Sequence, residues 1–100
     1  MEIKLDKKDS ALTIKLTERL DTVTSPDLEA FLQKELDGIT DLTFDFDELD
    51  YISSAGLRVL LSTQKKMLKQ GEMRIINASP VIMEIFEVTG FSDAIDIKAK

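Results

Sequence analysis

The feature that most limits the fold of this chain is a repeated change in the spacing of its hydrophobic residues. Apolar and polar residues alternate, as in half-buried strands, near residues 3–5, 12–16, 42–46 and 73–76. After each of the last three segments, apolar residues recur at intervals of three and four, the spacing of an amphipathic helix. The pattern predicts the order strand, strand, helix, strand, helix, strand, helix, with a last edge strand expected at residues 94–98.

Capping residues mark the predicted helix boundaries. Ser25 is expected to cap the first helix, with Pro26 at its first helical position, and Ser79 and Pro80 repeat this arrangement before the third helix. A glycine lies near the end of each helix: Gly38, Gly71 and Gly90. The second helix is expected to bury one apolar stripe: Leu57, Leu60, Leu61, Met67 and Leu68.

This order of elements predicts an α/β fold. The first two strands, joined by a short polar turn, form an antiparallel hairpin, whereas helical crossovers make the later strands parallel. Because the strands alternate, one face of the sheet is expected to be partly wet, with Thr13, Lys15, Thr43 and Asp45 on it. We therefore predict a mixed sheet of four or five strands with helices mainly on one face, in a single domain spanning residues 1–100.

The composition removes several classes of function. The chain has no Cys and no His, which excludes thiolate chemistry and the commonest general base, so we expect no metal and no cofactor. A net charge of -6 argues against a direct nucleic acid partner. No apolar run is long enough for membrane insertion, and the N-terminus lacks the apolar core of a signal peptide, so a cytoplasmic protein is expected.

The segment Ser53-Ser54-Ala55-Gly56 lies where the third strand meets the second helix, a common position for sites in α/β sheets. Its serines can simply cap the helix, and its two small residues can simply allow close packing. A catalytic serine lacks an activating base here, and the chain has no glycine-rich phosphate loop, so an enzyme is not expected. A phosphoacceptor is the third reading, since it needs only a hydroxyl that a kinase can reach.

Three stretches resemble the STAS domains of bacterial anti-sigma factor antagonists. They are "LDYISSAGLRVLL" after an "FDF" strand, "LTIKLTERLDTVTSPDL", and "GEMRIINASPVIMEIFEVTGFSDAIDI", and together they cover nearly the whole chain. The resemblance implies the STAS fold and a switch: the antagonist binds an anti-sigma factor that is also a serine kinase, and a sigma factor is released. Phosphorylation of a serine at the start of the second helix ends the binding, and a metal-dependent serine phosphatase restores it.

The family motif can be carried over residue by residue by aligning its Gly-Leu pair with Gly56 and Leu57. Ser53 then takes the place of an aspartate, Ser54 the first hydroxyl position, and Ala55 the second. The resemblance therefore implies phosphorylation at Ser54, with Ser53 as the second choice. Ala55 at the second acceptor position is a departure from the family pattern, as is the missing acid.

The resemblance also implies a partner surface beside this junction. Asp21, Thr22 and Thr24 match the loop before the first helix, which in the family lies next to the phosphorylated loop, although Asp21 also fits an ordinary turn residue. Arg58 should be exposed if Leu57 and Leu61 point inward, either as a partner contact or as plain surface. The expected partner-binding residues are Asp21, Thr22, Thr24, Ser53, Ser54, Ala55, Gly56 and Arg58.

Other functions remain open on the sequence alone. A non-switching STAS scaffold, such as a subunit of a lipid-transport ATPase, would keep its partner whatever the state of Ser54. A nucleotide-sensing STAS module would use the same helix N-terminus as an anion site. A serine hydrolase ranks last, because the chain has no His and no lysine or acid near the serines is suited to activate them.

Overall fold

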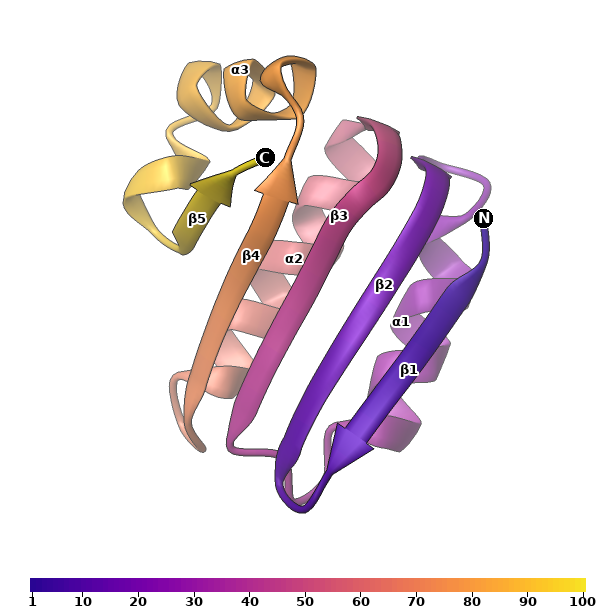
Figure 1. The fold of residues 1–100 in the computed structure, drawn as a ribbon, viewed down its shortest axis with the longest axis vertical. Helices are drawn as coiled ribbons and strands as arrows, with labels where there is room; N and C mark the ends of the chain where they lie inside the picture. Colours follow the sequence, from indigo (N-terminus) through magenta and orange to yellow (C-terminus); the bar gives the residue numbers. More distant parts are fainter.

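A computed structural model describes residues 1–100 as five strands, three α-helices and one short 3₁₀ turn (Figure 1). The elements are β1 (Ile3–Lys8), β2 (Ala11–Leu20), α1 (Ser25–Glu35), β3 (Asp41–Ile52), α2 (Ser54–Met67), β4 (Glu72–Ala78), α3 (Pro80–Val88), η1 (Phe91–Asp93) and β5 (Asp96–Ala99). None of the helices combines the length and the apolar character needed to cross a membrane.

The strands form one mixed sheet in the order β1-β2-β3-β4-β5. The hairpin β1–β2 is antiparallel, and β2, β3, β4 and β5 run parallel to one another, as predicted. Figure 1 shows α1 and α2 behind the sheet and α3 at the end of β4, so the prediction of helices mainly on one face is confirmed. Parallel crossovers also place the N-termini of α1 and α2 at the same end of the molecule.

The core lies between the sheet and the helices. Every second side chain along the central parts of β2 and β3 points to this core, and Ile14, Phe44 and Phe46 are fully buried there. The ring of Phe46 lies 6.4 Å from that of Phe86 on α3, which in turn lies 5.3 Å from that of Phe91. Through these aromatic contacts, α3 and the turn that follows it join the core on the same side of the sheet as α1 and α2.

The opposite face of the sheet carries polar pairs between neighbouring strands. Lys15 Nζ lies 3.3 Å from a carboxylate oxygen of Glu48, and Asn77 donates to Asp45 at 3.0 Å. Arg74 donates to Thr43 at 2.9 Å and pairs with Asp41. Thr13, Lys15, Thr43 and Asp45 are each half-exposed, which confirms the predicted wet face.

The predicted apolar stripe of α2 is partly wrong. Leu60 and Met67 are buried as expected, but Leu61 is 37% exposed and Leu68 is 72% exposed. The buried side of α2 also contains Gly56, Val59 and Thr63. Thr63 can be buried because its hydroxyl donates to Val59 O at 2.7 Å, so a polar residue takes a position that hydropathy assigns to leucine.

Candidate functional site

The junction between β3 and α2 gives its two serines different roles. Ser53 is extended, with φ -97 and ψ 175, and is the N-cap of α2. Its Oγ accepts a hydrogen bond from Gly56 N at 3.4 Å, and its own N–H donates to Leu20 O at 2.9 Å. The hydroxyl of Ser53 is therefore used to satisfy the helix end.

Ser54 is the first residue of α2 and is exposed. Its hydroxyl makes no hydrogen bond within the chain, because the capping position is already taken by Ser53. The first turn of α2 contains no acidic residue, so no side chain of that turn offsets the partial positive charge of this helix end. The capping role predicted for this segment thus falls to Ser53, and the hydroxyl of Ser54 is left exposed.

This division of roles predicts opposite outcomes for the two alanine substitutions. Ser53→Ala should lower the free energy of unfolding by about 1 kcal/mol, because it removes an N-cap acceptor. Ser54→Ala should change the free energy of unfolding by less than about 0.5 kcal/mol, because the hydroxyl of Ser54 is exposed and makes no hydrogen bond within the chain. Urea unfolding of both variants checks this, and a larger loss for Ser54→Ala would contradict the assignment.

Gly56, which is predicted to belong to the partner surface, has a packing role in this fold. The residue is buried under the first turn of α2. A Cβ built on it would lie 2.8 Å from Leu20 Cγ and 2.9 Å from Leu20 O. Gly56 therefore permits the close approach of α2 to the end of β2, the alternative that the sequence left open.

The loop between β2 and α1 is organised by Asp21 and Thr24. Asp21 Oδ1 accepts hydrogen bonds from Val23 N at 3.0 Å and from Thr24 N at 3.1 Å. The hydroxyl of Thr24 accepts from Asp21 N and donates to Arg19 O, both at 2.9 Å. Thr22, by contrast, is exposed, so within this loop Thr22 rather than Thr24 presents a free side chain.

The prediction that Ser25 caps α1 is wrong. The helix already includes Ser25, and the N-cap position is occupied by Thr24, whose side chain makes no capping hydrogen bond. The reason is that the turn organised by Asp21 makes the helix begin one residue earlier than predicted. Ser25 N donates to Asp21 O at 2.8 Å, so Ser25 already belongs to the helix. Pro26 is consequently the second residue of the helix and not, as predicted, the first, although it still lies in the first turn.

The hydrogen bonds to Asp21 predict a pH-dependent contribution to stability. The backbone N–H of Thr24, followed by that of Val23, lowers the pKa of this carboxyl below its usual value. A lowered folded-state pKa means that the stabilisation is present above about pH 4 and is lost as the pH falls through the folded pKa. Asp21→Ala should therefore unfold at lower urea than wild type at pH 7, and the two midpoints should converge as the pH falls below the folded-state pKa of Asp21. A difference independent of pH would contradict this.

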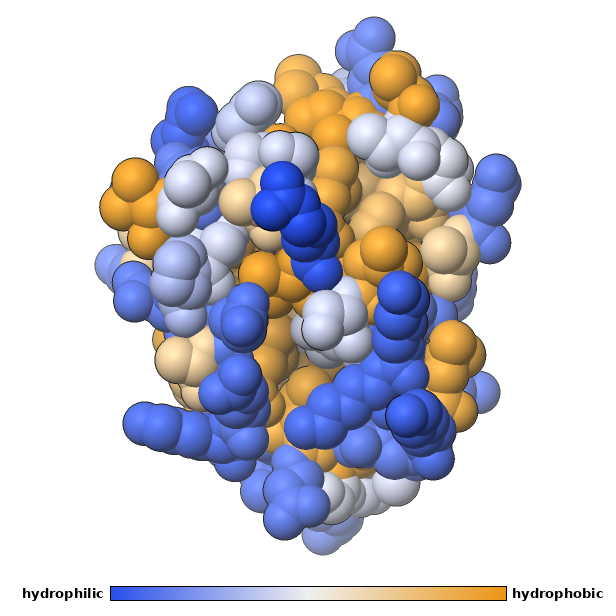
Figure 2. Space-filling model, turned by 180° about the vertical axis from the view of Figure 1, so that it is seen from behind, coloured by the Kyte–Doolittle hydropathy of each residue, from blue (hydrophilic) through white to orange (hydrophobic).

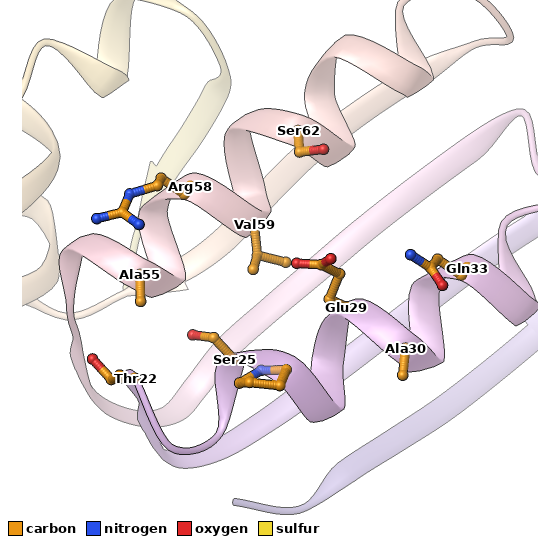
Figure 3. A pocket seen from close by; sticks show the side chains of 10 residues that line it. Thr22, Ser25, Glu29, Ala30, Gln33, Ala55, Arg58, Val59 and Ser62 are labelled. Carbon is orange, nitrogen blue, oxygen red and sulfur yellow. The ribbon is translucent and has the colours of Figure 1, made fainter.

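A groove of about 570 Å³ lies between the N-terminal halves of α1 and α2. Figure 3 shows its two walls, with Thr22, Ser25 and Glu29 on one side and Ala55, Arg58 and Ser62 on the other. Ser25 is only 4% exposed, and its Oγ has no hydrogen-bond partner. Figure 2 shows this helical side of the molecule, where apolar atoms reach the surface between strongly hydrophilic side chains.

The predicted site residues come together at this end of the molecule. Ser53 N donates to Leu20 O, so the loop of Asp21 lies beside the start of α2. Thr22, Ala55 and Arg58 line one groove. Arg58 is exposed as predicted, although Leu57 is only half-buried and Leu61 is itself exposed.

Comparison with known families decides the class of the domain. The family model described as "STAS domain" matches residues 2–100. This chain belongs to the STAS domain family. The fold described above is therefore a STAS fold.

Two relatives of this STAS domain carry functional names. It is 38% identical over 93 residues to BtrV of Bordetella bronchiseptica, named as an anti-sigma factor antagonist, covering 91% of this chain and 80% of that protein. It is 30% identical to the anti-sigma-B factor antagonist of Bacillus subtilis, covering 100% of this chain and 94% of that protein. The fold is also that of the Bacillus cell fate determinant SpoIIAA in its phosphorylated form, with a TM-score of 0.75 at 18% identity over 96% of this chain and 90% of that one.

Sequence reasoning missed several groove residues of this STAS domain. The sequence pattern predicts Ser25 only as a helix cap and gives no role to Glu29, Gln33 and Ser62, although all four line the groove. One signal was present, since small residues at Ala30, Ala55 and Ser62 leave room between two adjacent helices. Recognising it requires knowing that α1 and α2 are neighbours, which only the topology shows.

Proposed function

We propose that this STAS domain is an anti-sigma factor antagonist, which binds an anti-sigma factor and thereby releases a sigma factor. The observation that carries the proposal is the exposed, unbonded hydroxyl of Ser54 at the start of α2. The names of the Bordetella and Bacillus subtilis relatives, which align with nearly the whole chain, support it. The proposed surface comprises Asp21, Thr22, Ser53, Ser54, Ala55 and Arg58, with Thr24 holding the loop in place.

We further propose that the partner is a serine kinase that modifies Ser54. Ser54 Oγ would attack the γ-phosphorus of ATP, forming an Oγ–P bond while the bond to the β-phosphate oxygen breaks. ADP leaves, and a base of the kinase takes the hydroxyl proton. A metal-dependent phosphatase would reverse the change by hydrolysis, giving Ser54 and inorganic phosphate.

Electrostatics explains how one phosphate can switch binding while the domain stays folded. The phosphate adds about -1.5 to -2 charges to a chain whose net charge is -6. The N-terminus of α2 stabilises that charge, because its N–H groups and its partial positive charge face the anion. A partner packed against Ser54 would instead have to bury the phosphate or move away.

The proposal is tested by sigma release. The protein is titrated into a complex of a sigma factor and its anti-sigma factor from the same genome, and the species are counted by native mass spectrometry. The expected result is free sigma factor together with a new complex of this protein and the anti-sigma factor. If no anti-sigma factor of that genome binds, and a stable complex with transporter subunits forms instead, the scaffold reading replaces the proposal.

A further inference from the structure

We propose that a phosphate on Ser54 binds Arg58 of the same helix and so withdraws this arginine from the partner surface. The inference rests on the proposed function, since it describes what the modification of Ser54 does to the site. It assigns to Arg58 a role in both states of the switch. Unmodified, Arg58 is available to a partner; modified, it is held within the chain.

Arg58 differs from the other two arginines of the chain. Arg19 lies 3.5 Å from a carboxylate oxygen of Asp21 and 4.6 Å from the centre of the Tyr51 ring. Arg74 pairs with Asp41 and, at 3.3 Å, with Glu72. Arg58 makes no ion pair, although it lies in the groove that Glu29 also lines. The guanidinium is therefore free to take an anion that is absent from the unmodified chain.

The geometry of α2 brings Arg58 towards Ser54. Residues four apart on a helix are neighbours on one face, and an anion placed N-terminal to the cation is the favourable order. Helical side chains also lean towards the N-terminus. Figure 3 shows Arg58 extended back over the first turn of α2, in the direction of Ala55. A phosphate on Ser54 would therefore form on the side where the guanidinium already lies.

The surroundings supply further unused partners for an anion. The first turn of α2 has no acidic residue that would compete for Arg58. In the facing wall of the groove, Ser25 Oγ is buried and unpartnered, and Figure 3 shows it pointing across towards Ala55. An arginine and a buried hydroxyl without a partner thus lie at the same end of the groove, beside the N-terminus of α2. Of these two groups, Arg58 is the one expected to bind the phosphate, because its planar guanidinium can donate two parallel hydrogen bonds to one phosphate group.

The test installs phosphoserine at position 54 during translation, so that it does not depend on any kinase. The chain contains three arginines, and their three Nε–Hε signals can be followed separately by NMR. The Arg58 signal should move downfield and exchange more slowly in the phosphorylated protein, whereas those of Arg19 and Arg74 should stay in place. An unmoved Arg58 signal, or equal movement of all three, would overturn the inference.

A matched pair of variants gives a second readout. Arg58→Gln and Lys65→Gln remove the same charge from the exposed side of α2, but Lys65 lies about two turns further from the phosphate. Arg58→Gln should raise the second pKa of the phosphoserine, followed by ³¹P NMR, by about 0.5 unit, and Lys65→Gln should leave it nearly unchanged. Equal shifts would overturn the inference. A kinase that fails to modify Ser54 would overturn the proposed switch but not these two results.

Discussion

Ser54→Asp is expected to weaken binding to the anti-sigma factor by roughly 100-fold, equivalent to about 2.7 kcal/mol. The added carboxylate lies at the first position of α2, where it is stable in the free protein but must lose water or meet an acidic surface in the complex. Ser54→Ala should keep full affinity and should no longer respond to ATP, because the helix cap on Ser53 is intact. Isothermal titration calorimetry with the same partner measures both.

A control variant tests whether the loss of affinity depends on where the negative charge is added or only on its addition. Ser10 lies in the turn between β1 and β2, at the opposite end of the sheet from the start of α2, as Figure 1 shows. Ser10→Asp adds the same charge there, and it should change the affinity by no more than about threefold. If Ser10→Asp and Ser54→Asp weaken binding equally, the interface does not include the start of α2.

Gly56→Ala is expected to lower the free energy of unfolding by about 2 kcal/mol. The new methyl group would meet Leu20 Cγ at 2.8 Å and both Leu20 O and Ile52 Cγ1 at 2.9 Å, so the first turn of α2 must shift. Overpacking of this kind costs about 1–3 kcal/mol, and a helical alanine recovers up to about 1 kcal/mol of it. Urea unfolding measures the difference.

A second glycine serves as the comparison for this result. Gly38→Ala adds a methyl group with no neighbour within 4 Å, at φ +79, so it tests backbone strain without crowding. The two variants should also differ in partner binding. Gly56→Ala should weaken it, because a shift of the first turn of α2 moves Ser54, whereas Gly38→Ala should not. A Gly56→Ala protein as stable as wild type would contradict the close approach of α2 to β2.

Most of the fold could be predicted because it follows from hydrophobic periodicity. The alternation of Leu42, Phe44 and Phe46 predicts a strand whichever elements surround it, and helical crossovers predict parallel pairing. The position of the candidate site could be predicted for a similar reason, since the end of a parallel strand and the start of its helix are adjacent in sequence.

The predictions that fail, the cap of α1 and part of the apolar stripe of α2, concern residues whose position depends on more than their own hydropathy or capping preference. Distant contacts or competing hydrogen bonds determine whether such a residue is buried or caps a helix. Ser25 is a strong capping residue in isolation, but the bonds of Asp21 to Val23 and Thr24 fix the loop first. The sequence pattern does not place Thr63 in the core, because its burial depends on the hydrogen bond that its hydroxyl donates to Val59 O. That Arg58 makes no ion pair could not be predicted either, since it depends on which carboxylates the fold places near its guanidinium.

The central claim is that Ser54 is the switch, and intact mass spectrometry tests it most directly. Wild type, Ser54→Ala and Ser53→Ala are each incubated with the anti-sigma kinase that binds the protein and with Mg-ATP. The predicted result is one added phosphate on wild type and on Ser53→Ala, and none on Ser54→Ala. A kinase that is active on another substrate but leaves wild type unmodified, or that modifies Ser54→Ala as well as wild type, would contradict the account.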